Sequence, residues 1–130
     1  MYQVTVDVTA RGPLFDGRAD GYVAGYATEA RQEVARYAKN RWTGQLVQVI
    51  RRPTPYYWTQ LRVDERPGAS VVHDGGMVYG PWLEGTSSRN RTTRFKGYRS
   101  ARIVTQQVQA RAVEIAESVL PRWLARMRGQ

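Results

Sequence analysis

One stretch of the sequence, Val78 to Arg102, constrains the rest of the chain more than any other. Gly80 and Pro81 interrupt an apolar run there, which argues against a central strand and for an edge strand or a turn. Trp82 and Leu83 follow, and both side chains are too large and apolar to be left in water without cost. We therefore expect this part of the stretch to anchor the chain on a core and then to enter a loop.

A basic loop at about 86–98 follows the anchor, and it is longer than most loops in compact domains. Its basic residues have no acidic residue between them: Arg89, Arg91, Arg94, Lys96 and Arg99. Nothing large and apolar lies between Leu83 and Phe95, so the loop cannot recover the entropy of being fixed, and we expect it to be mobile in the isolated chain. The residues expected to anchor the two ends of the stretch are Tyr79, Pro81, Trp82, Phe95 and Tyr98.

The composition is that of one globular domain covering residues 1–130. Apolar residues make up 42% of the chain and charged residues 24%, which argues against wholesale disorder. The net charge of +9, from 20 Lys and Arg against 11 Asp and Glu, indicates a polyanionic neighbour, either nucleic acid or an acidic protein surface. The absence of cysteine excludes disulfides and thiolate chemistry. We expect neither a membrane span nor a signal peptide, because no apolar run is long enough.

The apolar periodicity predicts an α+β fold, with one small, mainly antiparallel sheet and two helices packed on it. The predicted strands are Tyr2–Thr9, Leu46–Arg52, Tyr56–Asp64, Ala69–His73 and Met77–Leu83, and the predicted helices are Asp20–Trp42 and Arg99–Met127. The element order is thus β-α-β-β-β-β-α, with the first strand at one side of the sheet. Gly44 stands where a helix terminator belongs, and the turn signal at 74–76 predicts a hairpin. Pro121 removes a backbone donor and predicts a kink or a restart in the last helix.

The sequence contains no motif for catalysis or metal binding, so we expect no catalytic, cofactor-binding or metal-binding residue and no enzymatic activity. His73 is the only histidine, and its neighbour Asp74 is too common a companion to indicate a catalytic pair. We interpret His73 as structural or exposed. A small basic nuclease can work without histidine, however, and Glu84 near Arg89 and Arg91 keeps that alternative open.

Basic and aromatic residues interleave from Arg94 to Arg99, as phosphate contact combined with base stacking would require. The competing interpretation is that Phe95 and Tyr98 only pin the end of the loop to the core, and we favour it for these aromatics. Anchoring does not explain the arginines, since a loop does not need so many charged residues to be soluble. A small nucleic-acid-binding protein or nuclease is therefore the alternative function, although no recognised nucleic-acid-binding motif is present.

The same stretch resembles a phage protein family. The segment Tyr79–Thr86, with the sequence YGPWLEGT, is similar to a motif of the tail-completion, or head–tail joining, proteins of long-tailed bacteriophages. The order of elements resembles that family over roughly Tyr22 to Leu124, which is most of the chain. The re-entry at Arg94–Tyr98 departs from the family, because it carries Lys96-Gly97 where a proline-containing form is common.

This resemblance implies a structural virion protein without catalysis, made in the cytoplasm of the host bacterium and located in the neck or at the top of the tail. Such proteins form a ring, expected to be six-fold, around the DNA channel and help to join the finished tail to the filled head. The implied partners are further copies of the chain and other phage neck and tail proteins, with no membrane. The basic loop would face either acidic groups of a neighbouring subunit or packaged double-stranded DNA in the channel, and the sequence leaves this choice open.

Overall fold

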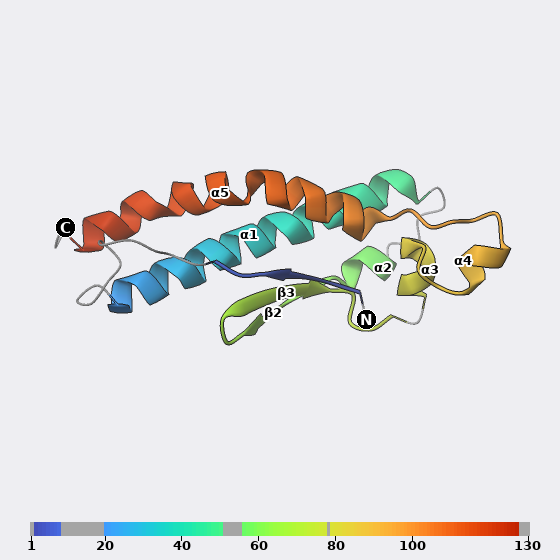
Figure 1. Ribbon diagram of the computed structural model, residues 1–130, viewed down its shortest axis with the longest axis horizontal. Helices are drawn as coiled ribbons and strands as arrows, with labels where there is room; N and C mark the ends of the chain where they lie inside the picture. The colour runs from blue at the N-terminus through green and yellow to red at the C-terminus, as the bar shows by residue number, and fades with distance from the viewer. Residues whose placement is uncertain (1, 9–19, 51–55, 78, 128–130) are drawn as a thin grey trace.

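Two long helices and a three-stranded antiparallel sheet form the body of the protein (Figure 1). The computed structural model describes residues 2–8, 20–50, 56–77 and 79–127. The elements in chain order are β1 (Gln3–Val6), α1 (Asp20–Val49), α2 (Tyr56–Thr59), β2 (Arg62–Arg66), β3 (Ala69–His73), α3 (Gly80–Glu84), α4 (Arg89–Thr92) and α5 (Ser100–Met127). The predicted α+β class is confirmed, whereas the predicted order of elements is wrong in detail.

The sheet has the strand order β1-β3-β2, with both pairs antiparallel. In its register Val72 of the central strand faces Val4 on one side and Val63 on the other. Val4 and Val6 are buried while Gln3 and Thr5 are exposed, the alternation of a strand with one covered face. The prediction that the first strand joins the sheet at one side is confirmed, although β1 is shorter than predicted and Thr9 lies outside the described residues.

The core lies between the sheet and the two long helices. α1 contacts all three strands, and α5 lies along α1 and beside β1 (Figure 1). The buried side chains of this core include Val34, Ala38, Trp42, Leu46, Val72 and Val104. A smaller apolar cluster, made of Tyr26, Ala30 and Val119, joins the two helices near the start of α1. Burial of each large apolar side chain contributes roughly 1.5–3 kcal/mol, so the paired helices supply much of the stability.

The helix α1 continues to Val49, so the predicted end after Trp42 and the predicted strand over Leu46–Arg52 are both wrong, apart from positions 51 and 52, which lie outside the described residues. The reason is an apolar stripe with a spacing of four residues from Val34 through Trp42 to Leu46, which is only 2% exposed. Gly44 is exposed within the helix and costs only about 1 kcal/mol there. Tertiary packing therefore overrides the expected terminator.

The predicted strand Tyr56–Asp64 is also wrong in its first half. Tyr56–Thr59 forms the short helix α2, and the strand β2 begins only at Arg62. The buried Tyr57 donates a hydrogen bond from its hydroxyl to Asp74, and this contact outweighs the β propensity of an aromatic run. The predicted strand Ala69–His73 is confirmed.

The predicted edge strand Met77–Leu83 is replaced by the helix α3, and Val78 lies outside the described residues. Pro81 stands at the first turn of α3, where its missing N–H costs no hydrogen bond. The predicted turn at 74–76 is present, because the side chain of Asp74 accepts the N–H of Gly76 at 2.9 Å, but the turn does not lead into a hairpin.

The helix α5 begins within one residue of the prediction and continues through Pro121 to Met127. Of the two predicted outcomes at Pro121, the restart is therefore wrong, and the kink stays a prediction. The carbonyl that Pro121 leaves without its helical partner belongs to Glu117, an exposed residue whose backbone can be hydrated. Packing of Val119 and Trp123 on either side of the proline keeps the two halves of the helix together. No helix in the described part of the chain is long and apolar enough to cross a membrane.

Candidate functional site: a basic lobe at one end of the molecule

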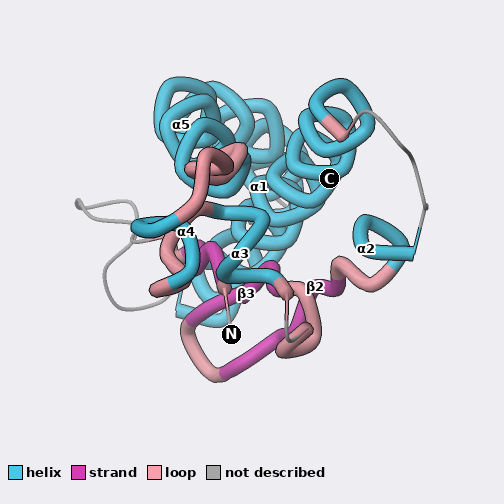
Figure 2. The backbone as a smooth tube through the Cα atoms, turned by 90° about the vertical axis from the view of Figure 1, so that its right-hand side faces the viewer, coloured by secondary structure: helices cyan, strands magenta, loops and turns pink. Residues whose placement is uncertain are grey.

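The motif and the basic loop fold together into one feature, which we call the basic lobe and define as residues 80–102. Figures 1 and 2 show α3 and α4 together at one end of the molecule, next to the start of α5. The lobe therefore contains most of the residues that the sequence marks as functional.

Gly80, the first glycine of the motif, makes room for a buried carboxylate. Asp74 is fully buried, and a Cβ at position 80 would lie 2.1 Å from its Oδ2 atom. The same Oδ2 accepts the hydroxyl of Tyr57 at 3.0 Å. Burial, and next the neighbouring Asp74, raise the pKa of Tyr57, so this hydroxyl stays protonated and remains a donor. Gly80 is thus required by the packing beneath α3.

Glu84, at the end of α3, caps the N-terminus of α5. Its Oε2 atom accepts the N–H of Ala101 at 2.9 Å and its Oε1 atom accepts the N–H of Arg102 at 3.1 Å. The side chain is 7% exposed, and this burial raises its pKa, against the lowering effect of the two N–H bonds and of Arg99. A carboxylate at this place satisfies two helix donors and complements the helix dipole.

The two ends of the loop cross with their backbones in contact at Gly85 and Gly97. A Cβ at position 85 would lie 2.2 Å from the carbonyl oxygen of Lys96, and a Cβ at position 97 would lie 2.2 Å from the Cα of Gly85. Both glycines have positive φ angles, +106° and +92°. The N–H of Tyr98 donates to the carbonyl of Leu83 at 2.7 Å and fastens the crossing. The Lys96-Gly97 pair therefore has a clear structural role here.

Asn90 holds the inside of the lobe together. It is 3% exposed, and its Nδ2 atom donates to the carbonyls of Trp82 and Phe95, each at 3.1 Å. Its Oδ1 atom accepts the N–H of Ser87 at 3.0 Å. The backbone of the loop is therefore tied to a single buried amide, a role that polar composition alone does not reveal.

The aromatic residues of the lobe stack on one another. Phe95 lies 4.9 Å from Trp82 and 4.9 Å from Tyr98 between ring centroids, and the guanidinium of Arg89 lies 5.2 Å from the Trp82 ring. Trp82 is only half-buried and lies outside the main core, so the prediction that it is a buried anchor is wrong; Leu83 packs against the core instead. Of the other predicted anchors, Tyr79 is 38% exposed and Pro81 is half-buried.

Four exposed arginines of the lobe make no hydrogen bond or ion pair through their side chains within the described residues: Arg91, Arg94, Arg99 and Arg102. Two of the predicted basic site residues are engaged internally. Arg89 stacks on Trp82, and the Nζ atom of Lys96 donates to the carbonyls of Asn90 at 2.9 Å and Arg91 at 3.3 Å. Arg102 was not among the predicted site residues, although it continues the run of basic residues without an acidic neighbour in the sequence.

The single histidine has a structural environment. His73 is 6% exposed, and its Nδ1 atom accepts the N–H of Gly75 at 2.9 Å. The ring proton is therefore on Nε2, which lies 2.6 Å from Oδ2 of Asp64 rather than near Asp74. Among the residues that the structure describes, no group of three or more His, Cys, Asp or Glu could hold a metal ion.

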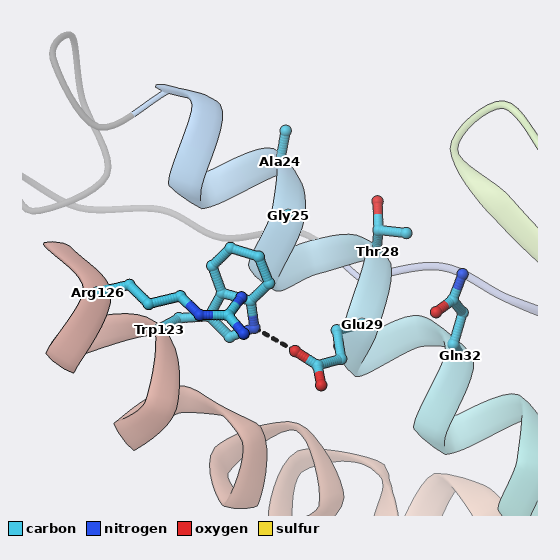
Figure 3. A pocket seen from close by; sticks show the side chains of 7 residues that line it. All are labelled: Ala24, Gly25, Thr28, Glu29, Gln32, Trp123 and Arg126. Atoms are coloured by element: carbon cyan, nitrogen blue, oxygen red, sulfur yellow. Dashed lines mark hydrogen bonds between the residues drawn. The ribbon is translucent and has the colours of Figure 1, made fainter. Parts of the chain in front are cut away.

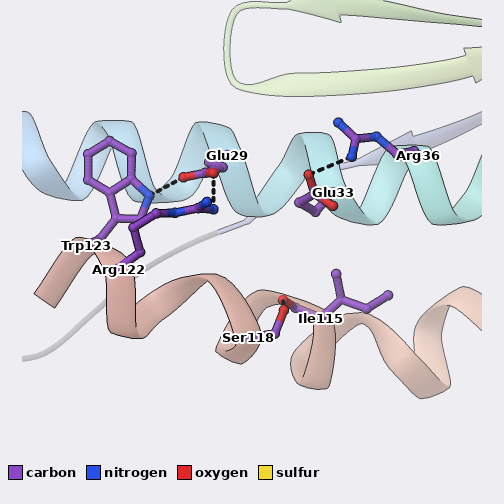
Figure 4. A network of polar contacts seen from close by, with 7 residues as sticks. All are labelled: Glu29, Glu33, Arg36, Ile115, Ser118, Arg122 and Trp123. Carbon is purple, nitrogen blue, oxygen red and sulfur yellow. Dashed lines mark hydrogen bonds and ion pairs between the residues drawn. The ribbon is translucent and has the colours of Figure 1, made fainter. Parts of the chain in front are cut away.

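A second feature lies toward the other end of the two long helices, where a shallow hollow of about 570 Å³ opens beside Gly25 (Figure 3). A Cβ at position 25 would lie 2.3 Å from the ring of Trp123, so the glycine admits this side chain. Glu29 accepts hydrogen bonds from both Trp123 and Arg122 (Figure 4), and Arg126 lies 4.4 Å above the Trp123 ring. These groups satisfy one another, so we interpret the hollow as a joint between helices and regard the basic lobe as the candidate site.

Comparison of the chain with protein-family models, with curated proteins and with solved structures finds no match.

Proposed function

We propose that the protein is a structural component of the virion of a long-tailed bacteriophage, located in the neck or at the top of the tail. Its copies form a ring that joins the tail to the DNA-filled head. The observation that carries the proposal is the structural use of the motif that resembles the tail-completion family. Gly80 clears a buried carboxylate, Pro81 begins α3, Glu84 caps α5 and Gly85 permits the backbone crossing. These four residues of the motif are each of a type that this geometry needs, which supports a shared architecture.

A ring requires a heterologous contact, in which one surface of a copy fits a different surface of the next. The sheet order β1-β3-β2 supplies two different outer edges among the described strands. β1 carries no charge over Gln3–Val6, whereas β2 carries charges at four of its five positions. An antiparallel pairing of two β2 strands centred on Asp64 would place Arg62 against Arg66, so like charges oppose it. Pairing of β1 with β2 of the next copy avoids this repulsion.

Cysteine pairs test this contact, since the chain has no cysteine of its own. Thr5→Cys would be combined in turn with Arg62→Cys, Asp64→Cys or Arg66→Cys; all of these side chains are exposed. β3 separates the two positions within one copy, so disulfides can form only between copies. We expect at least one pair to give a ladder of covalent oligomers under oxidation, whereas the single variants stop at dimers. Dimers alone from every pair would exclude this edge contact.

Genetic complementation tests the function. Deletion of the coding gene from the phage that carries it should leave filled heads and free tails, and supply of the intact protein should restore joined particles, both counted by electron microscopy. Complete virions in the absence of the protein would refute the proposal. The unpaired arginines of the lobe also fit the alternative, a small nucleic-acid-binding protein, which predicts no defect in joining.

A further inference from the structure

The basic lobe concentrates positive charge that no acidic residue close in the sequence balances. From residue 85 to residue 113 the sequence contains no acidic residue, and Glu84 is buried at the start of α5. Elsewhere Arg31, Arg36, Arg111 and Arg122 each form an ion pair with a glutamate. The four unpaired arginines of the lobe therefore present a concentrated positive field at one end of the molecule.

The well-exposed side chains of the lobe include no apolar anchor, because its aromatic residues are half-buried in their own stack. Between residues 86 and 99 every exposed side chain is polar or basic: Thr86, Ser88, Arg89, Arg91, Thr92, Thr93, Arg94, Lys96 and Arg99. Protein–protein interfaces usually have a buried apolar or aromatic centre, whereas interfaces with DNA are more polar and far more positively charged. This surface therefore matches a phosphate backbone better than it matches an acidic protein.

The aromatic side chains distinguish double-stranded from single-stranded nucleic acid. Proteins that bind single strands present free aromatic faces on which bases stack. Here Trp82, Phe95 and Tyr98 form a stack of their own, and Arg89 covers the Trp82 ring. The lobe thus offers guanidinium groups to phosphates and no stacking platform to bases.

The backbone that carries the arginines is held by contacts within the chain, more of them than the polar composition of the loop predicts. Asn90 and the crossing at Gly85 hold the loop between α3 and α5. Arg99 has a φ of +53°, an uncommon left-handed conformation for a residue with a side chain, and its N–H donates to the carbonyl of Glu84 at 3.1 Å. Preorganisation of this kind lowers the entropy lost on binding.

We infer that the basic lobe binds the phosphate backbone of double-stranded DNA, without sequence preference, through Arg91, Arg94, Arg99 and Arg102. In the virion this DNA would be the duplex that passes through the neck; only this last step rests on the proposed function. With up to four phosphates neutralised, the logarithm of the binding constant should fall with the logarithm of salt concentration with a slope of about −3.5. Affinity should therefore drop about 100-fold between 50 and 200 mM salt.

The experiment measures fluorescence anisotropy of the purified full chain with three labelled ligands over a salt series: a short DNA duplex, a single strand of the same length, and polyglutamate. The lobe variant replaces the four unpaired arginines with glutamine. A matched control replaces four exposed arginines outside the lobe, namely Arg36, Arg62, Arg66 and Arg111, and loses the same charge. We expect the lobe variant to bind the duplex at least 30-fold more weakly at 50 mM salt and the control less than 5-fold more weakly.

Circular dichroism confirms that both variants are folded, and a milder variant, Arg91→Gln with Arg94→Gln, should lose about half of the salt slope. Equal losses in the lobe variant and the control would overturn the inference, as would tighter binding to polyglutamate, which would identify an acidic protein as the partner. Equal affinity for the single strand would contradict the aromatic argument. If the lobe variant retains DNA affinity but fails to join heads and tails, only the DNA inference fails. If it loses DNA affinity but joins heads and tails normally, the DNA inference stands and only the step that makes the duplex in the neck its ligand fails.

Discussion

Glu84→Ala removes the acceptor of two backbone N–H groups at the start of α5, and we expect it to lower the free energy of unfolding by about 2–4 kcal/mol. Each of the two charge-assisted hydrogen bonds, at 2.9 and 3.1 Å, is worth roughly 1.5–3 kcal/mol. Relief from burying a carboxylate that is 7% exposed offsets part of this loss. The melting temperature should fall by about 10 °C.

Urea denaturation followed by circular dichroism and tryptophan fluorescence measures this loss. The matched control is Glu114→Ala on the surface of the same helix, where the carboxylate pairs with Arg111 at 2.9 Å and is well exposed. We expect the control to change stability by no more than about 0.5 kcal/mol. Amide exchange at Ala101 and Arg102 should accelerate in the Glu84 variant alone. If the Glu84 variant unfolds within 0.5 kcal/mol of the wild type, roughly the size of an ordinary surface substitution, the capping argument is wrong.

The pH dependence of the same site has a defined sign. Burial raises the pKa of Glu84 above its ordinary value of 4.5, so the folded state binds this proton more tightly than the unfolded state does. The stabilisation from protonation is fully present below about pH 4.5 and is lost as the pH rises through the raised pKa of the folded state. Glu84→Gln cannot titrate, so its deficit in stability relative to the wild type should be larger at pH 4 than at pH 8. A deficit that grows with rising pH would refute this assignment.

Three other substitutions, with Gly44→Ala as a control, test the packing of the lobe and its base by urea denaturation. Gly80→Ala should destabilise the protein by about 1–3 kcal/mol, because the new Cβ meets Asp74. Gly44→Ala lies at an open helical site and should stabilise the protein by roughly 0.5–1 kcal/mol. Equal effects of the two substitutions would contradict the steric argument. Asn90→Ala leaves buried backbone groups without a hydrogen-bond partner and should lower the free energy of unfolding by about 1–3 kcal/mol. A protease should also cleave the variant faster within residues 86–96. An unchanged cleavage rate would show that Asn90 does not hold the loop. Trp82→Ala should lower the free energy of unfolding by only about 1–2 kcal/mol, because the side chain is half-buried. Truncation of a fully buried tryptophan costs roughly 3–5 kcal/mol, so a loss above about 3 kcal/mol would show that Trp82 is a core anchor after all.

The sequence predicts the first strand and the last helix of this fold better than the elements between them. Alternation identified β1, and the apolar stripe of α5 placed its start within one residue. The spacing of Trp42 and Leu46 already indicates that α1 continues. A helix end at Gly44 is the wrong prediction because an exposed glycine inside a helix costs only about 1 kcal/mol. Local propensity therefore failed where burial of a single leucine outweighs it.

The candidate site was predicted in its location but not in its internal structure. The basic residues are visible in the sequence because they cluster without acidic neighbours. The cap from Glu84 to Ala101 spans 17 residues, and the contact between Gly85 and Gly97 depends on how two distant segments meet. No local pattern encodes such contacts. The sequence also could not show which arginines are consumed internally, since Arg89 is engaged by a ring that comes before it in the chain.

Because the chain crosses itself at Gly85 and Gly97, the length of the loop between them has little effect on the stability of the rest of the fold. Because the two ends are fastened where they enter, residues inserted after Thr92, beyond α4 and Asn90, would leave α3 and α5 in place, and doubling the loop would cost only about 0.6 kcal/mol in closure entropy. The tip is therefore a place where an affinity tag or a fluorophore can be inserted into the protein. It is equally a place where one scaffold can acquire tips of different reach.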